Sequence, residues 1–326
     1  MDPVVSQFVL GAVVPGAVST VTLGLLWFGT TRRRVMTPCA ALTTSNAQVT
    51  DTTLVPGSTA AISQANAPRL RAAGVPFLAT LAVVFAQSKL VTNGWSFPPV
   101  DAYGWLGTLA VGAGAVGCAT ALSRTPFVGV IIASIGVAAA MPVAALAAKL
   151  SLNDSIVLVL AGTVLFAGLN MALRKPGLVQ AIFVWLLLIA CSQTLILAFS
   201  SLRLGVLVHT LAAVAGGVMI VALVWPGVRI GTPGAASLSI ILIAVFAQGY
   251  NLGADSAPLW VRLGVMLLLL LSPLVFAISL RVLQSRTGML VRPLVSACVS
   301  LAVAAIPAAI ALAISAWAYM NVADSP

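Results

Sequence analysis

The chain of 326 residues is 61% hydrophobic and only 7% charged, with a mean hydropathy of +1.13. Because a soluble domain carries roughly 25% charged residues, this composition excludes a soluble fold and makes lipid the solvent for most of the surface. The net charge is +10, but the basic residues form no stripe with interleaved aromatics, which argues against nucleic acid as a partner.

Long uninterrupted apolar runs, such as residues 264–280, predict membrane-spanning helices. In lipid every backbone polar group needs a partner within the protein, so only helices or a closed barrel can span. Barrel strands would alternate apolar and polar positions, which these runs do not. We therefore predict an all-α fold, a polytopic transmembrane helix bundle of about ten spans, with the lipid bilayer as its surroundings.

The first predicted span lies in residues 1–28, with its apolar part at 8–28. Arginines at 32–34 follow it and no basic residue precedes it. It is therefore predicted to be a reverse signal anchor that starts outside, and not a cleaved signal peptide. Residues 29–74, rich in Thr, Ser, Ala and Asn, show no helical apolar period and are predicted to be a flexible cytoplasmic loop.

Residues 75–326 are predicted to form a bundle of nine further spans. These lie at about 75–93, 103–122, 126–148, 155–173, 177–200, 205–225, 235–254, 261–281 and 291–319. Basic residues favour cytoplasmic segments. With the N-terminus outside, the inner segments hold twelve basic residues and one acid, and the outer segments hold four basic residues and five acids. Both termini are therefore predicted to be non-cytoplasmic.

Glutamines recur in the outer halves of three predicted spans, at Gln87, Gln193 and Gln248. The first and the last stand in similar segments, 82–87 and 244–248. The separations of 106 and 55 residues are near multiples of about 54 residues, the length of one two-span hairpin, which predicts tandem hairpin repeats instead of inverted ones. Chance matches between Ala- and Val-rich helices are the alternative.

The candidate site residues are these three glutamines and His209, the one histidine of the chain. Three amides at one depth could line a cavity for a polar neutral solute. They could instead join neighbouring helices, each bond contributing about 0.6 kcal/mol. His209 is expected about one turn inside the outer end of its span, as a proton-sensitive ligand or as a histidine bonded to a neighbouring helix.

Catalytic and metal chemistry find little support in the sequence. No Asp or Glu lies within a predicted span core, the four cysteines lack CxxC spacing, and no HExxH, GxSxG or P-loop motif occurs. We therefore predict no catalytic residue, no metal site and no cofactor, and an enzyme is the weaker hypothesis.

Two classes of function are left. The favoured one is a permease or channel-like protein for a neutral or lipid-like solute, which works without a carboxylate relay. The alternative is a non-catalytic membrane subunit that scaffolds or anchors a larger complex, with protein partners or as a homo-oligomer. The preference for Arg and the abundance of Ala are typical of a GC-rich bacterial genome, so we predict the bacterial cytoplasmic (inner) membrane.

Overall fold

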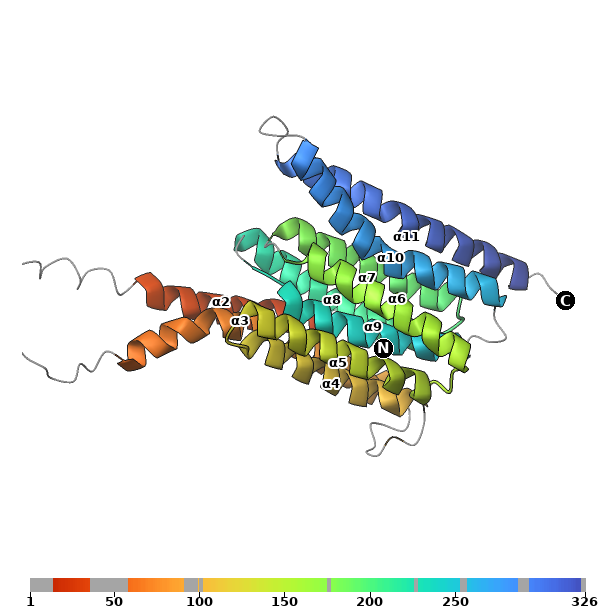
Figure 1. Ribbon diagram of the computed structural model, residues 1–326, viewed down its shortest axis with the longest axis horizontal. Helices are drawn as coiled ribbons and strands as arrows, with labels where there is room; N and C mark the ends of the chain where they lie inside the picture. Colours follow the sequence, from red (N-terminus) through yellow and green to blue (C-terminus); the bar gives the residue numbers. More distant parts are fainter. Residues whose placement is uncertain are drawn as a thin grey trace, which may run out of the picture.

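The computed structural model describes residues 14–35, 58–90, 99, 102–174, 177–225, 228–252, 257–286 and 293–323. The regular structure among these residues is ten helices, which run side by side along one direction (Figure 1). They are α2 (Val14–Val35), α3 (Ser58–Leu90), α4 (Ala102–Leu122), α5 (Pro126–Ala147), α6 (Leu152–Ala172), α7 (Leu178–Leu197), α8 (Leu202–Val224), α9 (Gly231–Leu252), α10 (Leu259–Arg286) and α11 (Pro293–Ala323).

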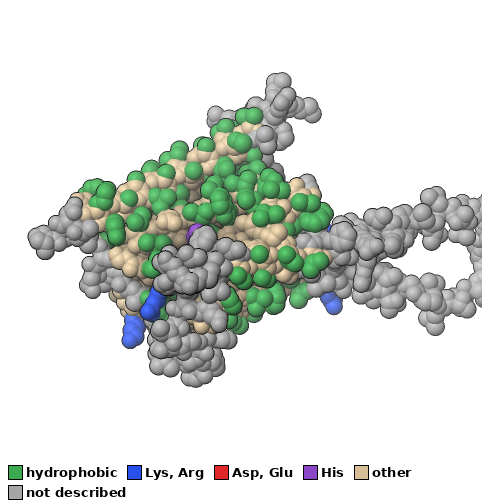
Figure 2. Space-filling view, turned by 180° about the vertical axis from the view of Figure 1, so that it is seen from behind, with side chains coloured by type: hydrophobic (Ala, Val, Ile, Leu, Met, Phe, Trp, Pro, Cys, Tyr) green, Lys and Arg blue, Asp and Glu red, His purple; other side chains and the backbone are tan. Residues whose placement is uncertain are grey.

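The predicted all-α membrane bundle is confirmed. From α3 to α11, nine of the described helices are long and apolar enough to cross a membrane. Among its described residues, α2 is apolar over Val14–Leu23, and residues 8–13 of its predicted span lie outside the described residues. Figure 2 shows hydrophobic side chains spread over one face, with the few basic ones toward its two ends, as a lipid-facing surface requires.

The structure differs from the sequence-based prediction of a loop over residues 29–74. The helix α2 continues to Val35 and α3 begins at Ser58, so both ends of this segment are helical, and residues 36–57 lie outside the described residues. The start of α3 is rich in Ala, with Leu, Gln and Arg, which have high helix propensity. High helix propensity is enough to form this part of α3, although its apolar residues do not recur with a helical period.

Helices α4, α6, α8 and α10 begin at the end of the bundle where α3, α5, α7 and α9 finish (Figure 1). The charge distribution predicts this end to be non-cytoplasmic. It is called the outer end below, and the opposite one the inner end. The orientation in the membrane and the tandem repeat both stay predictions.

Short polar caps begin several helices. The first N–H groups of a helix have no partner within it, and a preceding Ser or Thr side chain satisfies one of them. Thr125 accepts from the backbone nitrogen of Val128 at the start of α5, and Ser151 accepts from that of Asp154 at the start of α6. These caps allow the tight turns between consecutive spans.

Helix α9 lies at the centre of the bundle. It contacts α3, α4, α5, α6 and α8, and its residues from Gly231 to Asn251 are almost all buried. Its rotation is fixed in part by Ser237, whose hydroxyl donates a 2.8 Å hydrogen bond to the carbonyl of Ala113 in α4. By contrast, α11 lies at the edge against α10 and α7 and is mostly exposed.

Helix α2 packs on α8 through small residues. A Cβ atom on Gly217 would lie 2.9 Å from Cβ of Ser19 and 3.1 Å from the carbonyl oxygen of Gly16. Only a residue without a side chain lets two membrane helices approach this closely. The crossing places α2 beside the middle of α8.

Candidate functional site

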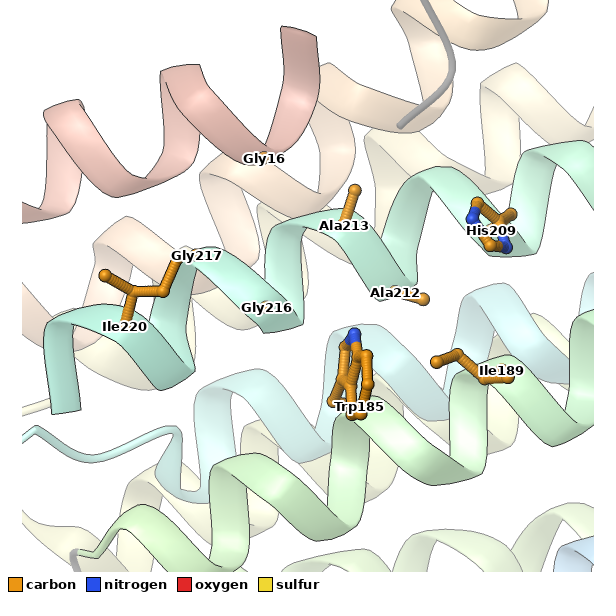
Figure 3. Close-up of a pocket in the computed structure, with 9 residues that line it drawn as sticks. All are labelled: Gly16, Trp185, Ile189, His209, Ala212, Ala213, Gly216, Gly217 and Ile220. Atoms are coloured by element: carbon orange, nitrogen blue, oxygen red, sulfur yellow. The ribbon is translucent and has the colours of Figure 1, made fainter. Parts of the chain in front are cut away.

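A cavity of about 330 Å³ lies between α2, α7 and α8 (Figure 3). It is called the α8 groove here and is lined by Gly16, Trp185, Ile189, His209, Ala212, Ala213, Gly216, Gly217 and Ile220. Trp185 and Ile189 rise from α7 toward α8, and His209 stands at the opposite end from Ile220 (Figure 3). The groove thus runs along α8 with its two polar rings on different helices.

The space in the groove comes from residues with small side chains. Gly216 has no side chain facing Trp185, and a Cβ atom built on it would lie 3.5 Å from the indole Nε1, an ordinary contact. Apart from the rings of Trp185 and His209, the side chains that line the groove are apolar. The groove is therefore an apolar site with polar groups at two positions.

The groove lies near the middle of two apolar candidate spans, α7 and α8. Trp185 comes seven residues after Leu178 in the 20-residue span of α7, which places it about 10 Å from the inner end of a span about 30 Å long. His209 comes seven residues after Leu202 in α8, about 10 Å from the outer end. Trp185 is thus about 5 Å from the middle of α7 on its inner side, and His209 is about 6 Å from the middle of α8 on its outer side.

The indole N–H of Trp185 has no acceptor among the described residues. Its side chain is half-buried in the groove, and its Nε1 faces Gly216 (Figure 3). Trp is usually found at the membrane interface with its N–H toward polar groups. A donor at this depth, facing a cavity, is the most unusual polar feature of the site.

The three predicted glutamines do not gather in one place. Gln87 and Gln248 are buried, each 1% exposed, whereas Gln193 is exposed on α7. Gln193 shares its stripe with Leu186, which is seven residues away and also exposed. None of the three glutamines lines the α8 groove. None lines the cavity between α2 and α3 or the cavity between α7, α10 and α11 either.

Gln87 is bonded to the outer end of α4, and Gln248 lies on the side of α9 that carries Ser237. Nε2 of Gln87 donates a 2.6 Å hydrogen bond to the carbonyl of Tyr103 in the first turn of α4. Gln248 lies eleven residues after Ser237, about three turns, and so on the α4-facing side of α9. Oε1 of Gln87 and both amide atoms of Gln248 have no partner among the described residues.

Two further cavities open between helices and are apolar. One of about 270 Å³ lies between α2 and α3, and one of about 240 Å³ lies between α7, α10 and α11. The first lies beside Pro15 and Ser19 on another side of α2 from the groove. Helix α2 is therefore flanked by two apolar crevices, which hydrocarbon can fill.

A polar cluster that the sequence analysis missed joins α6, α9 and α10 at the outer end. The hydroxyl of Tyr250 donates a 2.8 Å hydrogen bond to Oδ1 of Asp154, and Ser151 donates a 2.6 Å bond to Oδ2. Arg262 is only 6% exposed, donates from Nη1 to the carbonyl of Tyr250 at 2.7 Å, and lies 5.1 Å from the centre of its ring. Its signal in the sequence is an arginine just inside a span.

This cluster fits a structural role better than a chemical one. The carbonyl of Tyr250 is among the last four of α9, which no N–H of the helix can reach, and Arg262 satisfies it. Among the described residues, no three His, Cys, Asp or Glu side chains lie close enough together to hold a metal ion. The α8 groove is thus the better candidate site.

Comparisons of the chain with protein-family models, with curated proteins and with solved structures give no match.

Proposed function

We propose that this integral multi-pass membrane protein is a permease or channel-like protein for a lipid-like solute, which it holds in the α8 groove. One observation carries the proposal: the groove is apolar, lies near the middle of two candidate membrane spans and contains two polar rings. Of the neutral or lipid-like solutes that the sequence allows, the lipid-like class fits it better. A polar solute would need an open polar cavity, and Gln193 stands apart from Gln87 and Gln248.

The groove would select its solute by shape and by polar contacts. Lipid tails are as apolar as the side chains that line the groove, so burial alone gives an apolar solute little gain over the bilayer. The floor of glycine and alanine and the rings of Trp185 and His209 are the features that distinguish the groove from lipid. A solute that fits the glycine and alanine surface and bonds to the rings would enter the groove laterally from the bilayer.

A non-catalytic subunit in a larger complex is the second candidate. It is favoured by the almost completely buried α9 and by α11, which exposes most of its length, with Trp317 and Tyr319 near its end. This arrangement is a tightly packed core with one loosely covered helix. A scaffold would use α11 to contact its partner.

The experiment that separates the two candidates measures movement of a lipid-like probe between leaflets. The full chain is reconstituted in phosphatidylcholine vesicles with a trace of lysophosphatidylcholine that carries an NBD group on its acyl chain. Dithionite then bleaches probe that reaches the outer leaflet. We expect faster loss of the protected fluorescence than in empty vesicles, and a slower rate in Gly216→Leu, which fills the groove.

The matched control is Gly112→Leu, because a Cβ atom there would meet no atom within 4 Å. This variant should retain the wild-type rate. A wild-type rate equal to that of empty vesicles would overturn the permease proposal and leave the scaffold. A stimulated rate that Gly216→Leu does not slow would show that the solute passes elsewhere.

A further inference from the structure

We infer that the ligand of the α8 groove is a hydrophobic molecule with a hydrogen-bond acceptor in its apolar part, such as the carbonyl of a quinone or of a long-chain ketone, and that the indole N–H of Trp185 donates to it. The inference rests on the proposed function, since it names the class of solute for the same groove. Three observations support the inference: the orientation of the Trp185 ring, the position of Trp185 along its span, and the open space in front of its indole N–H.

The indole N–H can only donate, so its partner must be an acceptor. No described residue supplies one, and acyl chains carry no acceptor at all. A polar group without a partner in hydrocarbon is costly. A carbonyl group that enters the groove with its ligand would therefore gain a bond that the surrounding lipid cannot offer.

The acyl chain of a glycerolipid can enter the groove, but the depth of Trp185 keeps its donor out of reach of the ester carbonyls of such a lipid. The ester carbonyls of a glycerolipid lie at the edges of the hydrocarbon region, about 15 Å from its middle. Trp185 is about 5 Å from the middle, by its position in the span of α7. A ligand that reaches it must carry its acceptor well inside the apolar region, as quinones and keto-lipids do.

Gly216 leaves the N–H accessible from the groove. A Cβ atom on this residue would lie 3.5 Å from Nε1 of Trp185, so even alanine would occupy the space before the donor. The groove volume of about 330 Å³ is within the range of about 300–1,000 Å³ that small-molecule sites occupy. A ring with a carbonyl fits such a volume.

The test uses two probes that differ in the acceptor. The detergent-solubilised full chain is titrated with decylubiquinone or with decylbenzene, which has the same alkyl chain on a ring without carbonyls. The bound fraction is measured by native mass spectrometry. We expect one equivalent of the quinone on the wild type and weaker binding of decylbenzene.

The variant Trp185→Phe keeps the aromatic ring and removes the donor. Its affinity for the quinone should fall about five-fold, the effect of one neutral hydrogen bond, while its affinity for decylbenzene stays the same. Gly216→Ala, which covers the donor, should weaken quinone binding by a similar factor. The matched controls Trp260→Phe, at an exposed tryptophan, and Gly264→Ala, with open space around it, should bind like the wild type.

The outcomes separate this inference from the proposed function. Equal binding of the quinone to the wild type and to Trp185→Phe would overturn the inference, and so would equal affinities of the wild type for the two probes. If Gly216→Leu then prevents binding of both, the groove still holds lipid-like solutes. If neither probe binds, or Gly216→Leu affects neither, the inference and the groove proposal both fail. Thermal unfolding midpoints like that of the wild type show that each variant is folded.

Discussion

The hydroxyl of Tyr250 donates a 2.8 Å hydrogen bond to Oδ1 of Asp154 and thereby links the outer end of α9 to the start of α6. Asp154 is partly exposed, which screens the interaction. We expect Tyr250→Phe to lower the stability by about 1 kcal/mol, because the ring and its packing are retained and one hydrogen bond is lost. Thermal unfolding in detergent measures the change, with Tyr319→Phe at the exposed end of α11 as the control. An unchanged Tm would show that water replaces this bond without cost.

The buried guanidinium of Arg262 should matter more than that hydroxyl. Removing it in Arg262→Leu leaves the carbonyl of Tyr250 without its partner, and a buried acceptor without a partner costs about 1–3 kcal/mol. Arg262→Lys retains a donor and should lose less. The same unfolding assay ranks the two variants. Equal losses of stability would show that Arg262 does not stabilise the protein through its hydrogen bond to this carbonyl.

The close approach of α6 to α10 predicts a large effect from a single methyl group. A Cβ atom on Gly168 would lie 2.6 Å from the backbone nitrogen of Leu274, which cannot move away as a side chain can. We expect Gly168→Ala to destabilise the bundle by about 1–3 kcal/mol. Gly264→Ala adds the same methyl group where no atom lies within 4 Å. It should be neutral or stabilising, since alanine has the higher helix propensity.

The two buried glutamines should respond in opposite directions. Gln87 donates to the carbonyl of Tyr103, so Gln87→Leu should lower stability by about 1 kcal/mol. Both amide atoms of Gln248 are buried without a partner among the described residues, so Gln248→Leu should raise stability by about 1 kcal/mol. A loss of stability in Gln248→Leu would show instead that its amide has a partner, such as a bound water. The exposed Gln193→Leu serves as the control.

The span positions could be predicted from the sequence because apolar runs of about 20 residues seldom form anything but membrane-spanning helices. The start of α3 at Ser58 was missed because its helix depends on alanine propensity and has no apolar period. The depth of each glutamine along its helix could also be predicted. Its rotation could not, because packing of neighbouring helices decides which side faces lipid, and the exposed stripe of Leu186 and Gln193 is visible only in the assembled bundle.

The groove could not be predicted from the sequence for a related reason. Its walls combine two consecutive helices, which hold Trp185 and Gly216, with Gly16 of α2, which is far from both in the chain. Each of them, taken alone, is typical of a packing or interface residue in a membrane helix. Only their meeting across α2, α7 and α8 makes a cavity with a donor in it.

The central position of α9 has a consequence for how the protein is made. A chain is synthesised from its N-terminus, so α3, α4, α5 and α6 enter the membrane well before the helix that all four contact. Until α9 is made, the surfaces that they turn toward it are covered by lipid, by a membrane chaperone or by the other helices already inserted. The bundle is therefore completed from the inside late in synthesis, and a nascent chain that stops before Gly231 carries most of the helices but lacks the one around which they are arranged.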